Sequence, residues 1–408
     1  MRALLFYCAL LCWLSTASAQ NAAGDSAELR QISNQFEPFF HQLLQREQIP
    51  GAAFVVVTRD QVIKLGTGGY ASIDSPEPIL ADSVFRLASV SKTFAGELAA
   101  ILASENKLRL DDPVSRHVPQ FRIRGALTPI TLTNLLSQSS GIVAHAWDNL
   151  IEDGRAVADI LPRFSELRQV CQPGACYSYQ NVAFSLVEQA IVAATNSSYQ
   201  RQMQLRIFDP LGMRNASIGY ADLLASERLA QPHVKQRKQW VMGEIEQDYY
   251  RLSPAAGVNA SIVDVALWLQ AQLGARPDVI KPELVQMVTT PQIRTKATVR
   301  RKHWREHLSN AWYGMGWRVY EFQGETLIGH GGWVSGYRSE IAWSPKHNIG
   351  FAVLLNAEDS SASELITTFW DQALHPALLA EQSDDDKQSP QQAPASSETA
   401  VISYGSND

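Results

Sequence analysis

Strand patterns near both ends of the chain, with helical patterns between them, constrain the fold most. The stretch Ala52–Thr58 (AAFVVVT) predicts a buried strand, and Val62–Thr67 follows it after a short polar turn. Four late segments have the β-branched and aromatic content of sheet: Tyr313–Phe322, Thr326–Gly329, Tyr337–Trp343 and Ile349–Leu355. We therefore expect an α+β fold with one sheet built from both ends of the chain and a helical lobe inserted between them.

Apolar residues at helical spacing predict the main helices. Residues 29–44 carry Leu, Ile and Phe at this spacing, and a second helix starts near Ser89. Further helices are expected at Val182–Ala194, Ile262–Leu273 and Ser363–Leu374. Hydrophobic residues make up 45% of the chain, which is enough for a sizeable core.

The two ends of the chain differ in composition from the rest. Residues 1–19 combine Arg2, an apolar run and the small residues Ala17-Ser18-Ala19, which is the pattern of a signal peptide. The run is too short for a stable anchor, so we expect no membrane span after cleavage and a periplasmic or secreted protein. Residues 381–408 have almost no aliphatic side chains and are expected to be disordered. The net charge of −6 argues against nucleic acid as a partner.

The cysteines agree with export. Cys8 and Cys12 would leave with the signal peptide, so that Cys171 and Cys176 remain, separated by Gln-Pro-Gly-Ala. A Pro-Gly turn can bring the two together, and in an oxidising compartment we expect a disulfide. Two free thiols are the alternative, and a zinc site lacks a second cysteine pair.

The main chemical signal is Ser89-Val90-Ser91-Lys92. A serine hydroxyl is a poor nucleophile until a base takes its proton, and a lysine one helical turn later lies within reach of it. A lysine packed among apolar neighbours can lose its charge and act as that base. The spacing alone is weak evidence, because Ser104 and Lys107 repeat it near a helix end. The first copy follows an apolar strand, which is the better place for a site.

Two further motifs could complete such a site. Tyr179 can relay a proton to a leaving group, and Asn181 can bind a substrate amide through its donor and its acceptor. In Gly329-His330-Gly331-Gly332-Trp333 the glycines allow close approach to the backbone, and the amide of Trp333 could form an oxyanion hole with that of Ser89. His330 is expected to face the pocket. Each motif also has an ordinary structural explanation, a packed tyrosine or a hairpin.

In this order the three motifs resemble the serine β-lactamases and penicillin-binding peptidases, especially the class C β-lactamase and D-Ala-D-Ala carboxypeptidase branch. The segments FRLASVSKTFAG, TLTNLLSQSSGI, SPAAGVNASIVDVALWL and GHGGWVSGYRS carry the likeness. It implies an antiparallel sheet flanked by helices, with an inserted all-helical lobe, and no cofactor. It also implies that Ser89 is acylated, Lys92 is its base and Tyr179 its proton partner. The substrate ligands would be Asn181, His330, Gly332, Trp333 and Asn356.

One departure concerns specificity. β-Lactamases of this type usually carry Lys-Thr-Gly where this chain has His330-Gly331-Gly332, and that lysine helps to hold the substrate's carboxylate. A histidine is mostly neutral at pH 7, so efficient β-lactam hydrolysis is in doubt. Arg338 could supply the charge, although a surface role is the alternative. The acyl donor, a β-lactam, a cell-wall or other D-amino-acid peptide or an ester, stays open.

Two other functions compete with a serine hydrolase. His303, Glu306 and His307 fit an inverted zinc-protease motif, but they lie in a charged connecting segment, so we expect no metal there. A non-catalytic penicillin-binding or peptidoglycan-binding sensor domain would keep the fold without turnover. The expected domain spans residues 20–380. Its sheet lobe covers about residues 28–100 and 310–378, and its helical lobe covers about residues 101–309.

Overall fold

The structure is a computed structural model that describes residues 26–126, 128–296 and 298–375. The signal peptide expected at residues 1–19 and the tail expected at residues 381–408 lie outside these ranges. In the described part of the chain, no helix has the length and apolar character needed to cross a membrane.

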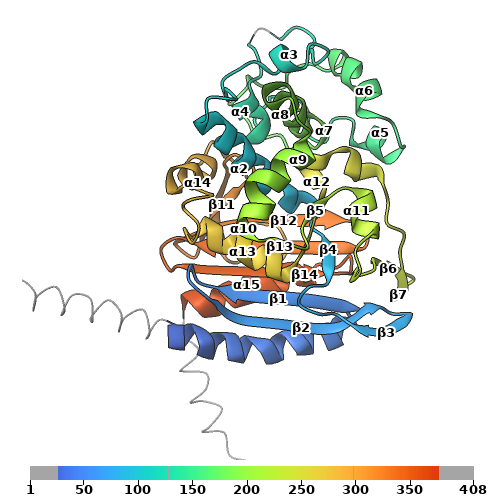
Figure 1. The fold of residues 1–408 in the computed structure, drawn as a ribbon, viewed down its shortest axis with the longest axis vertical. Coiled ribbons are helices and arrows are strands. Elements are labelled where there is room, and N and C mark those ends of the chain that lie inside the picture. The colour runs from blue at the N-terminus through green and yellow to red at the C-terminus, as the bar shows by residue number, and fades with distance from the viewer. Residues whose placement is uncertain (1–25, 127, 297, 376–408) are drawn as a thin grey trace, which may run out of the picture.

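A nine-stranded antiparallel sheet joins the two ends of the chain, as the sequence predicts (Figure 1). The first strand along the sequence, β1, pairs with the last one, β14, and Ala52 lies opposite Leu355. In sheet order the strands are β3 (Ser75–Pro78), β2 (Val62–Ser72), β1 (Gly51–Val57), β14 (Ile349–Leu355), β13 (Tyr337–Ser344), β12 (Glu325–Val334), β11 (Arg318–Phe322), β10 (Leu308–Tyr313) and β9 (Ile293–Arg294).

Strand β1 is buried on both faces of the sheet. Ala53, Val55 and Val57 point into one core, whereas Phe54 and Val56 point into the other. Successive side chains alternate between the two faces of a strand, so a strand that is covered on both sides needs an apolar residue at every position. This explains the continuous apolar run in the sequence.

One face of the sheet is covered by helices from opposite ends of the chain. The helix over residues 26–47 and α15 (Ser361–Leu374) pack together there, and both were expected from helical spacing. The ring centres of Phe36 and Phe351 lie 5.3 Å apart, and those of Phe351 and Phe369 lie 4.1 Å apart. These aromatic contacts join both helices to the same strand.

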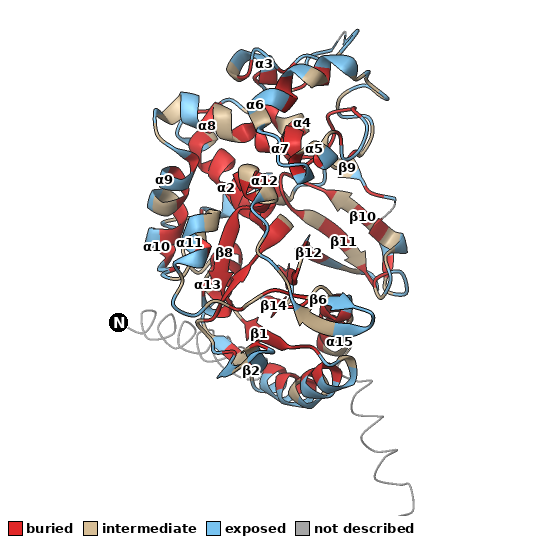
Figure 2. Cartoon of the chain, turned by 90° about the vertical axis from the view of Figure 1, so that its right-hand side faces the viewer, coloured by how far each residue is buried: buried red, intermediate tan, exposed pale blue. Residues whose placement is uncertain are grey.

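The other face carries α13 (Ile262–Gln272), which packs against β1 and β14. Helix α2 (Ser91–Ser104) lies next to it, and the rings of Phe94 and Trp268 stack with their centres 4.1 Å apart. Figure 2 shows α2 as a buried element between the sheet and the outer helices. The predicted boundaries place α13 in the helical lobe, but its packing joins it to the sheet.

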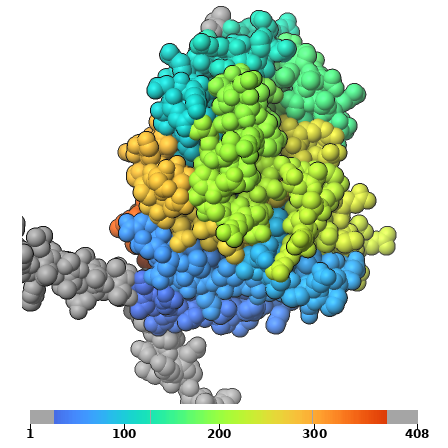
Figure 3. All heavy atoms as spheres, in the orientation of Figure 1, coloured from blue at the N-terminus to red at the C-terminus, as the bar shows by residue number. Residues whose placement is uncertain are grey.

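Short helices form the region above the sheet in Figure 1. The band from α9 to α11 runs down one face of the molecule in Figure 3. The helical elements beyond those above are η1 (Ala88–Val90), α3 (Val114–His117), α4 (Leu132–Leu136), α5 (Asp148–Glu152), α6 (Val157–Ile160), η2 (Leu161–Glu166), α7 (Val182–Ser185), α8 (Val187–Thr195), α9 (Tyr199–Met203), the π-helix η3 (Gln204–Phe208), α10 (Asp209–Leu211), α11 (Tyr220–Leu224), η4 (Asp248–Arg251), α12 (Ser253–Ala256), α14 (Pro282–Thr289) and η5 (Thr298–Arg300).

The middle of the chain also contains short strands, which the sequence patterns did not reveal. Their lengths of two to four residues give too little alternation to detect. A three-stranded sheet contains β4 (Val84–Arg86), β8 (Val258–Ser261) and β5 (Ser217–Ile218), and a separate hairpin contains β6 (His233–Gln236) and β7 (Gln239–Met242).

The prediction of one strand over Tyr313–Phe322 is wrong. Strand β10 ends at Tyr313, and β11 starts at Arg318 after a tight turn. Gly316 in this turn has a φ of 83°, and a Cβ there would lie 2.1 Å from the carbonyl oxygen of Lys92. The turn therefore needs glycine, both for its backbone conformation and for its contact with α2.

Candidate active site

Ser89 lies in the short turn η1 between β4 and α2. The residue before it, Ala88, has a φ of 49°, in the left-handed region that residues with a Cβ rarely adopt. Ala88 is buried, so the surrounding structure holds this conformation in place. The turn presents Ser89 at the beginning of α2 and in the wall of a pocket.

Lys92, in the first turn of α2, lies directly beside Ser89. Its Nζ is 3.3 Å from Ser89 Oγ. The same nitrogen donates hydrogen bonds to Asn181 Oδ1 at 2.8 Å and to the carbonyl oxygen of Ala255 at 3.0 Å. The side chain is fully buried. The structure therefore brings together the serine and the lysine that the sequence pairs.

Burial lowers the pKa of Lys92 to about 7, because a low-dielectric site disfavours the charged amine. Asp148 opposes this effect and Arg318 adds to it. At neutral pH a substantial fraction of the amine is therefore uncharged. An uncharged amine beside a serine hydroxyl can accept its proton.

Tyr179 also lies close to Lys92, whose Nζ is 4.8 Å from the centre of the tyrosine ring. Burial raises the pKa of Tyr179, while the charge of Arg318 and the neighbouring Ser89 side chain lower it in part. The phenol is therefore protonated at neutral pH. It can donate a proton, and it cannot serve as a phenolate base in this state.

Strand β12 passes close to the turn that carries Ser89. A Cβ on Gly332 would lie 2.2 Å from the carbonyl oxygen of Leu87 and 2.2 Å from Ser339 Oγ, so this position requires glycine. Ser339 Oγ also donates a hydrogen bond to that carbonyl oxygen at 2.8 Å. Trp333 follows at the pocket wall, with 63% of its surface exposed.

His330 does not face the pocket, contrary to the prediction. It is a residue of β12 and is only 1% exposed; its Nε2 is 2.9 Å from Tyr313 Oη, and its Nδ1 is 2.8 Å from the carbonyl oxygen of Gly331. Burial, with the charges of Arg318 and Lys92 nearby, lowers its pKa well below the usual value. A neutral, buried imidazole cannot attract an anionic substrate.

Asn356 is also outside the pocket, so its expected role in binding a carboxylate is not supported. Its side chain is fully buried, and its Nδ2 donates to the carbonyl oxygens of Tyr70 and Ala71 at 3.1 Å each. The amide holds β2 beside the end of β14. The sequence could place Asn356 at the end of a strand, but not decide which way its side chain points.

Arg318, at the start of β11, is a pocket residue that sequence reasoning missed. Its guanidinium donates to Thr298 Oγ1 at 2.9 Å, and the described residues contain no carboxylate paired with it. Arg338 also lines the pocket, but Glu340 lies 3.5 Å from it and also 2.9 Å from Arg301. In the sequence, the one hint at this role is an arginine at the start of a strand with aromatic residues. The pairing of β11 within the sheet, which the sequence does not reveal, is what brings Arg318 to the site.

A pocket of about 620 Å³ lies where these elements meet. Asn181 contributes to its wall, and its amide also joins Lys92 to Asp148, since Asn181 Nδ2 donates to Asp148 Oδ2 at 2.7 Å. Asp148 and its neighbour His145 are two further lining residues that the sequence did not single out. The pocket wall also contains the predicted catalytic and oxyanion-binding residues Ser89, Tyr179, Gly332 and Trp333.

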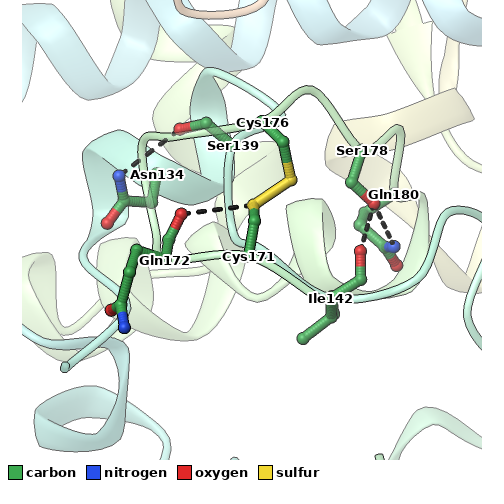
Figure 4. Close-up of a disulfide and its surroundings, with 8 residues drawn as sticks. All are labelled: Asn134, Ser139, Ile142, Cys171, Gln172, Cys176, Ser178 and Gln180. Carbon is green, nitrogen blue, oxygen red and sulfur yellow. Dashed lines mark hydrogen bonds between the residues drawn. A yellow bond between two sulfur atoms is a disulfide. The ribbon is translucent and has the colours of Figure 1, made fainter. Parts of the chain in front are cut away.

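The two cysteines of the expected pair lie just before Tyr179 in the chain. Figure 4 shows them joined, with Ser178 and Gln180 beyond Cys176. Their sulfur atoms are 1.98 Å apart, which is the distance of a disulfide. The carbonyl oxygen of Ser139 accepts from the amide of Gly174 at 2.7 Å, and the Ser178 hydroxyl binds the carbonyl oxygen of Ile142. The cysteine loop is thus joined to the segment after α4.

The zinc-protease alternative is not supported by the arrangement of its residues. His303, Glu306 and His307 lie in consecutive turns, not on a helix. His307 stacks on Phe322 and binds Gln323. Across the described ranges, no three His, Cys, Asp or Glu side chains form a group that could hold a metal ion.

The fold places Ser89, Lys92 and Tyr179 together beside the glycines of β12. This combination defines the class of proteins that share the fold of penicillin-binding proteins and carry a serine in the pocket. The chain belongs to the beta-lactamase family, because the family model described as Beta-lactamase matches residues 36–374.

Its curated relatives are distant in sequence. Protein flp of Staphylococcus aureus is 27% identical over 336 residues, which cover 81% of this chain and 64% of flp. The chain thus spans less than two thirds of that relative's length. A Beta-lactamase of Escherichia coli is 25% identical over 325 residues, which cover 78% of each protein.

Two solved structures share the fold, which agrees with the sequence prediction. The octameric penicillin-binding protein homologue from Pyrococcus abyssi has a TM-score of 0.75 at 23% identity, covering 85% of this chain and 77% of that one. EstCE1, a hydrolase with promiscuous acyltransferase activity, has a TM-score of 0.70 at 18% identity, covering 85% and 99%. At these identities the likeness concerns the fold.

Proposed function

We propose that the protein is an exported serine hydrolase that forms an acyl-enzyme at Ser89. The observation that carries this proposal is the 3.3 Å contact between Ser89 Oγ and the buried amine of Lys92. A hydroxyl nucleophile needs a base whose pKa is near the working pH, and the pKa of Lys92, about 7, meets that need. The beta-lactamase family, to which the chain belongs, generally consists of serine hydrolases.

The reaction follows from the protonation states of the site. Uncharged Lys92 takes the proton of Ser89 as its oxygen attacks the substrate carbonyl carbon, and the amides of Ser89 and Trp333 bind the oxyanion. Tyr179 gives its proton to the leaving nitrogen or oxygen and regains one from Lys92. Water then attacks the ester carbonyl, so that the acid is released and the Ser89 hydroxyl is restored.

The substrate class in this proposal is a small amide or ester that carries a carboxylate. His330 is buried and neutral, so it cannot perform the role of the usual lysine. Arg318 lies in the pocket without a carboxylate partner among the described residues. A guanidinium binds a carboxylate well through two parallel hydrogen bonds. A β-lactam or a D-amino-acid peptide has the required groups.

Export is part of the same proposal. The pattern of residues 1–19 supports a signal peptide, and the paired sulfur atoms of Cys171 and Cys176 agree with an oxidising compartment. We therefore place the mature protein in the periplasm or outside the cell.

A turnover assay on a small panel tests the proposal. Nitrocefin, a peptide ending in D-Ala-D-Ala and a nitrophenyl ester are each incubated with the protein and with Ser89→Ala. We expect turnover of at least one compound and its loss in the variant. If fluorescent penicillin binds while no compound turns over, the non-catalytic penicillin-binding or sensor function is favoured instead.

A further inference from the structure

One carboxylate oxygen connects the rim of the pocket with the buried amine. Asp148 Oδ2 accepts a hydrogen bond from Asn181 Nδ2 at 2.7 Å and lies 2.9 Å from His145 Nδ1. Asn181 Oδ1 in turn accepts from Lys92 Nζ at 2.8 Å. A continuous chain of hydrogen bonds therefore runs from His145 through two side chains to the amine beside Ser89.

The order of donors and acceptors fixes how Asn181 is oriented. A carboxylate only accepts hydrogen bonds, so the amide nitrogen of Asn181 must face Asp148. The amide oxygen is then turned towards Lys92, whose ammonium form only donates. Without Asp148 the amide could rotate and place its own hydrogens against the amine. The carboxylate thus determines which atom Lys92 meets.

The backbone of the loop before α5 fixes the positions of His145 and Asp148. His145 and Trp147 have φ values of 56° and 65°, in the left-handed region that strains residues other than glycine. The amide of His145 donates to the carbonyl oxygen of Tyr179 at 2.8 Å. The loop is therefore joined to the segment that carries the catalytic tyrosine. The Asp148 side chain is 10% exposed and that of His145 is 59% exposed, and both residues line the pocket.

We propose that Asp148 is a positioning residue of the active site, which holds Asn181 against Lys92 and connects this pair to His145 at the pocket rim. The proposal rests on the function proposed above. Asp148 does not contact Ser89, so it acts through Asn181 and through its charge. His145, with its Nδ1 proton on Asp148, presents Nε2 as the other ring nitrogen.

The electrostatic consequences have definite signs. The negative charge of Asp148 raises the pKa of Lys92, and it also raises the pKa of His145. A protonated His145 and Lys92 disfavour each other's charge. The other ionisable groups that act on these side chains are Glu152, Tyr179, Tyr249 and Arg318.

The test follows the rate of Ser89 labelling by a fluorophosphonate as a function of pH. The labelling rate should rise with pH as Lys92 loses its proton, and this rise is the limb of the pH profile that is followed. In Asp148→Asn the negative charge that raises the pKa of Lys92 is lost, so the limb should move to lower pH by about one unit. In His145→Gln a neutral amide replaces an imidazole whose protonated form disfavours the charge of Lys92, so the limb should move to higher pH. The matched control is Asp153→Asn, which removes an exposed carboxylate at the end of α5.

The outcomes separate this inference from the proposed function. If the unaltered protein is not labelled at Ser89, the proposed function fails. If it is labelled but the limb stays in place in both Asp148→Asn and His145→Gln, Asp148 has only a structural role and the inference is wrong. Thermal unfolding is measured for each variant to establish that it is folded. If one of Asp148→Asn and His145→Gln does not fold, the pH profile of the other one decides. A shift in Asp153→Asn equal to that in Asp148→Asn would also overturn the inference.

Discussion

The guanidinium carbon of Arg318 lies 5.6 Å from the centre of the Tyr179 ring. It also lies 5.3 Å from the centre of the Tyr313 ring, and Tyr313 in turn binds His330. The positive charge at this end of the pocket is therefore on β11, one strand away from where the usual lysine would stand. Arg318 lines the pocket and has no carboxylate partner among the described residues. A buried cation without such a partner favours the binding of an anionic ligand.

Replacement of this charge should weaken binding of substrates that carry a carboxylate. We predict that Arg318→Met raises KM for such a substrate about 10- to 100-fold, the range expected for a lost charged hydrogen bond. A nitrophenyl ester without a carboxylate should lose less. Arg338 shares Glu340 with Arg301, so Arg338→Met should have the smaller effect. A larger KM change in Arg338→Met would show that the anion site has been misassigned.

The buried amine should be costly for stability and essential for labelling. Burial lowers the pKa of Lys92 from 10.5 to about 7, so between these values the unfolded chain holds a proton that the folded protein has released. Stability therefore rises with pH across that window. We predict that Lys92→Met removes this slope, raises the melting temperature at pH 7, and lowers fluorophosphonate labelling at least about 100-fold. Calorimetry over the window, together with the labelling rate, measures both effects.

A buried carboxylic acid should give the opposite dependence of stability on pH. Glu97 on α2 is fully buried, and burial raises its pKa from 4.5 to about 8, an effect that the nearby Gln272 side chain opposes only in part. The stabilisation from its protonated form is complete below pH 4.5 and is lost as pH rises through about 8. We predict that Glu97→Gln raises the melting temperature more at pH 8 than at pH 5. An equal change at both pH values would contradict this protonation state.

The cysteine pair should stabilise the segment that carries Tyr179. Closing so small a ring is worth about 2 kcal/mol by loop entropy. We predict that Cys171→Ser/Cys176→Ser lowers the free energy of unfolding by about this amount and slows labelling of Ser89, because Tyr179 follows Cys176 by only three residues. Denaturant unfolding and the labelling rate are measured with and without reductant. Reductant should affect the unaltered protein and not the variant.

The fold could be predicted in outline because its strongest patterns are local. The apolar run at Ala52–Thr58 and the spacing in residues 29–44 each reflect burial within one element. The turn between Tyr313 and Arg318 was missed, because its aromatic and apolar residues continue the strand pattern and only contact with α2 shows why glycine is needed there. Strands of two to four residues leave no periodicity to detect.

The site could be predicted only where the spacing within one helix determines it. Ser89 and Lys92 meet because they are one turn apart, and they do so in the structure. His330 and Asn356 turn away from the pocket because their partners, Tyr313 Oη and the carbonyl oxygens of β2, belong to other strands. Arg318 reaches the site through sheet register, which no sequence pattern shows.

The central claim is that Ser89 is the acylated nucleophile. The most direct measurement is peptide mapping by mass spectrometry after incubation with a fluorophosphonate or a penicillin. The account predicts a single adduct on the peptide that contains Ser89, absent in Ser89→Ala and strongly reduced in Lys92→Met. An adduct that persists in Ser89→Ala, or none at all on the folded protein, would contradict it.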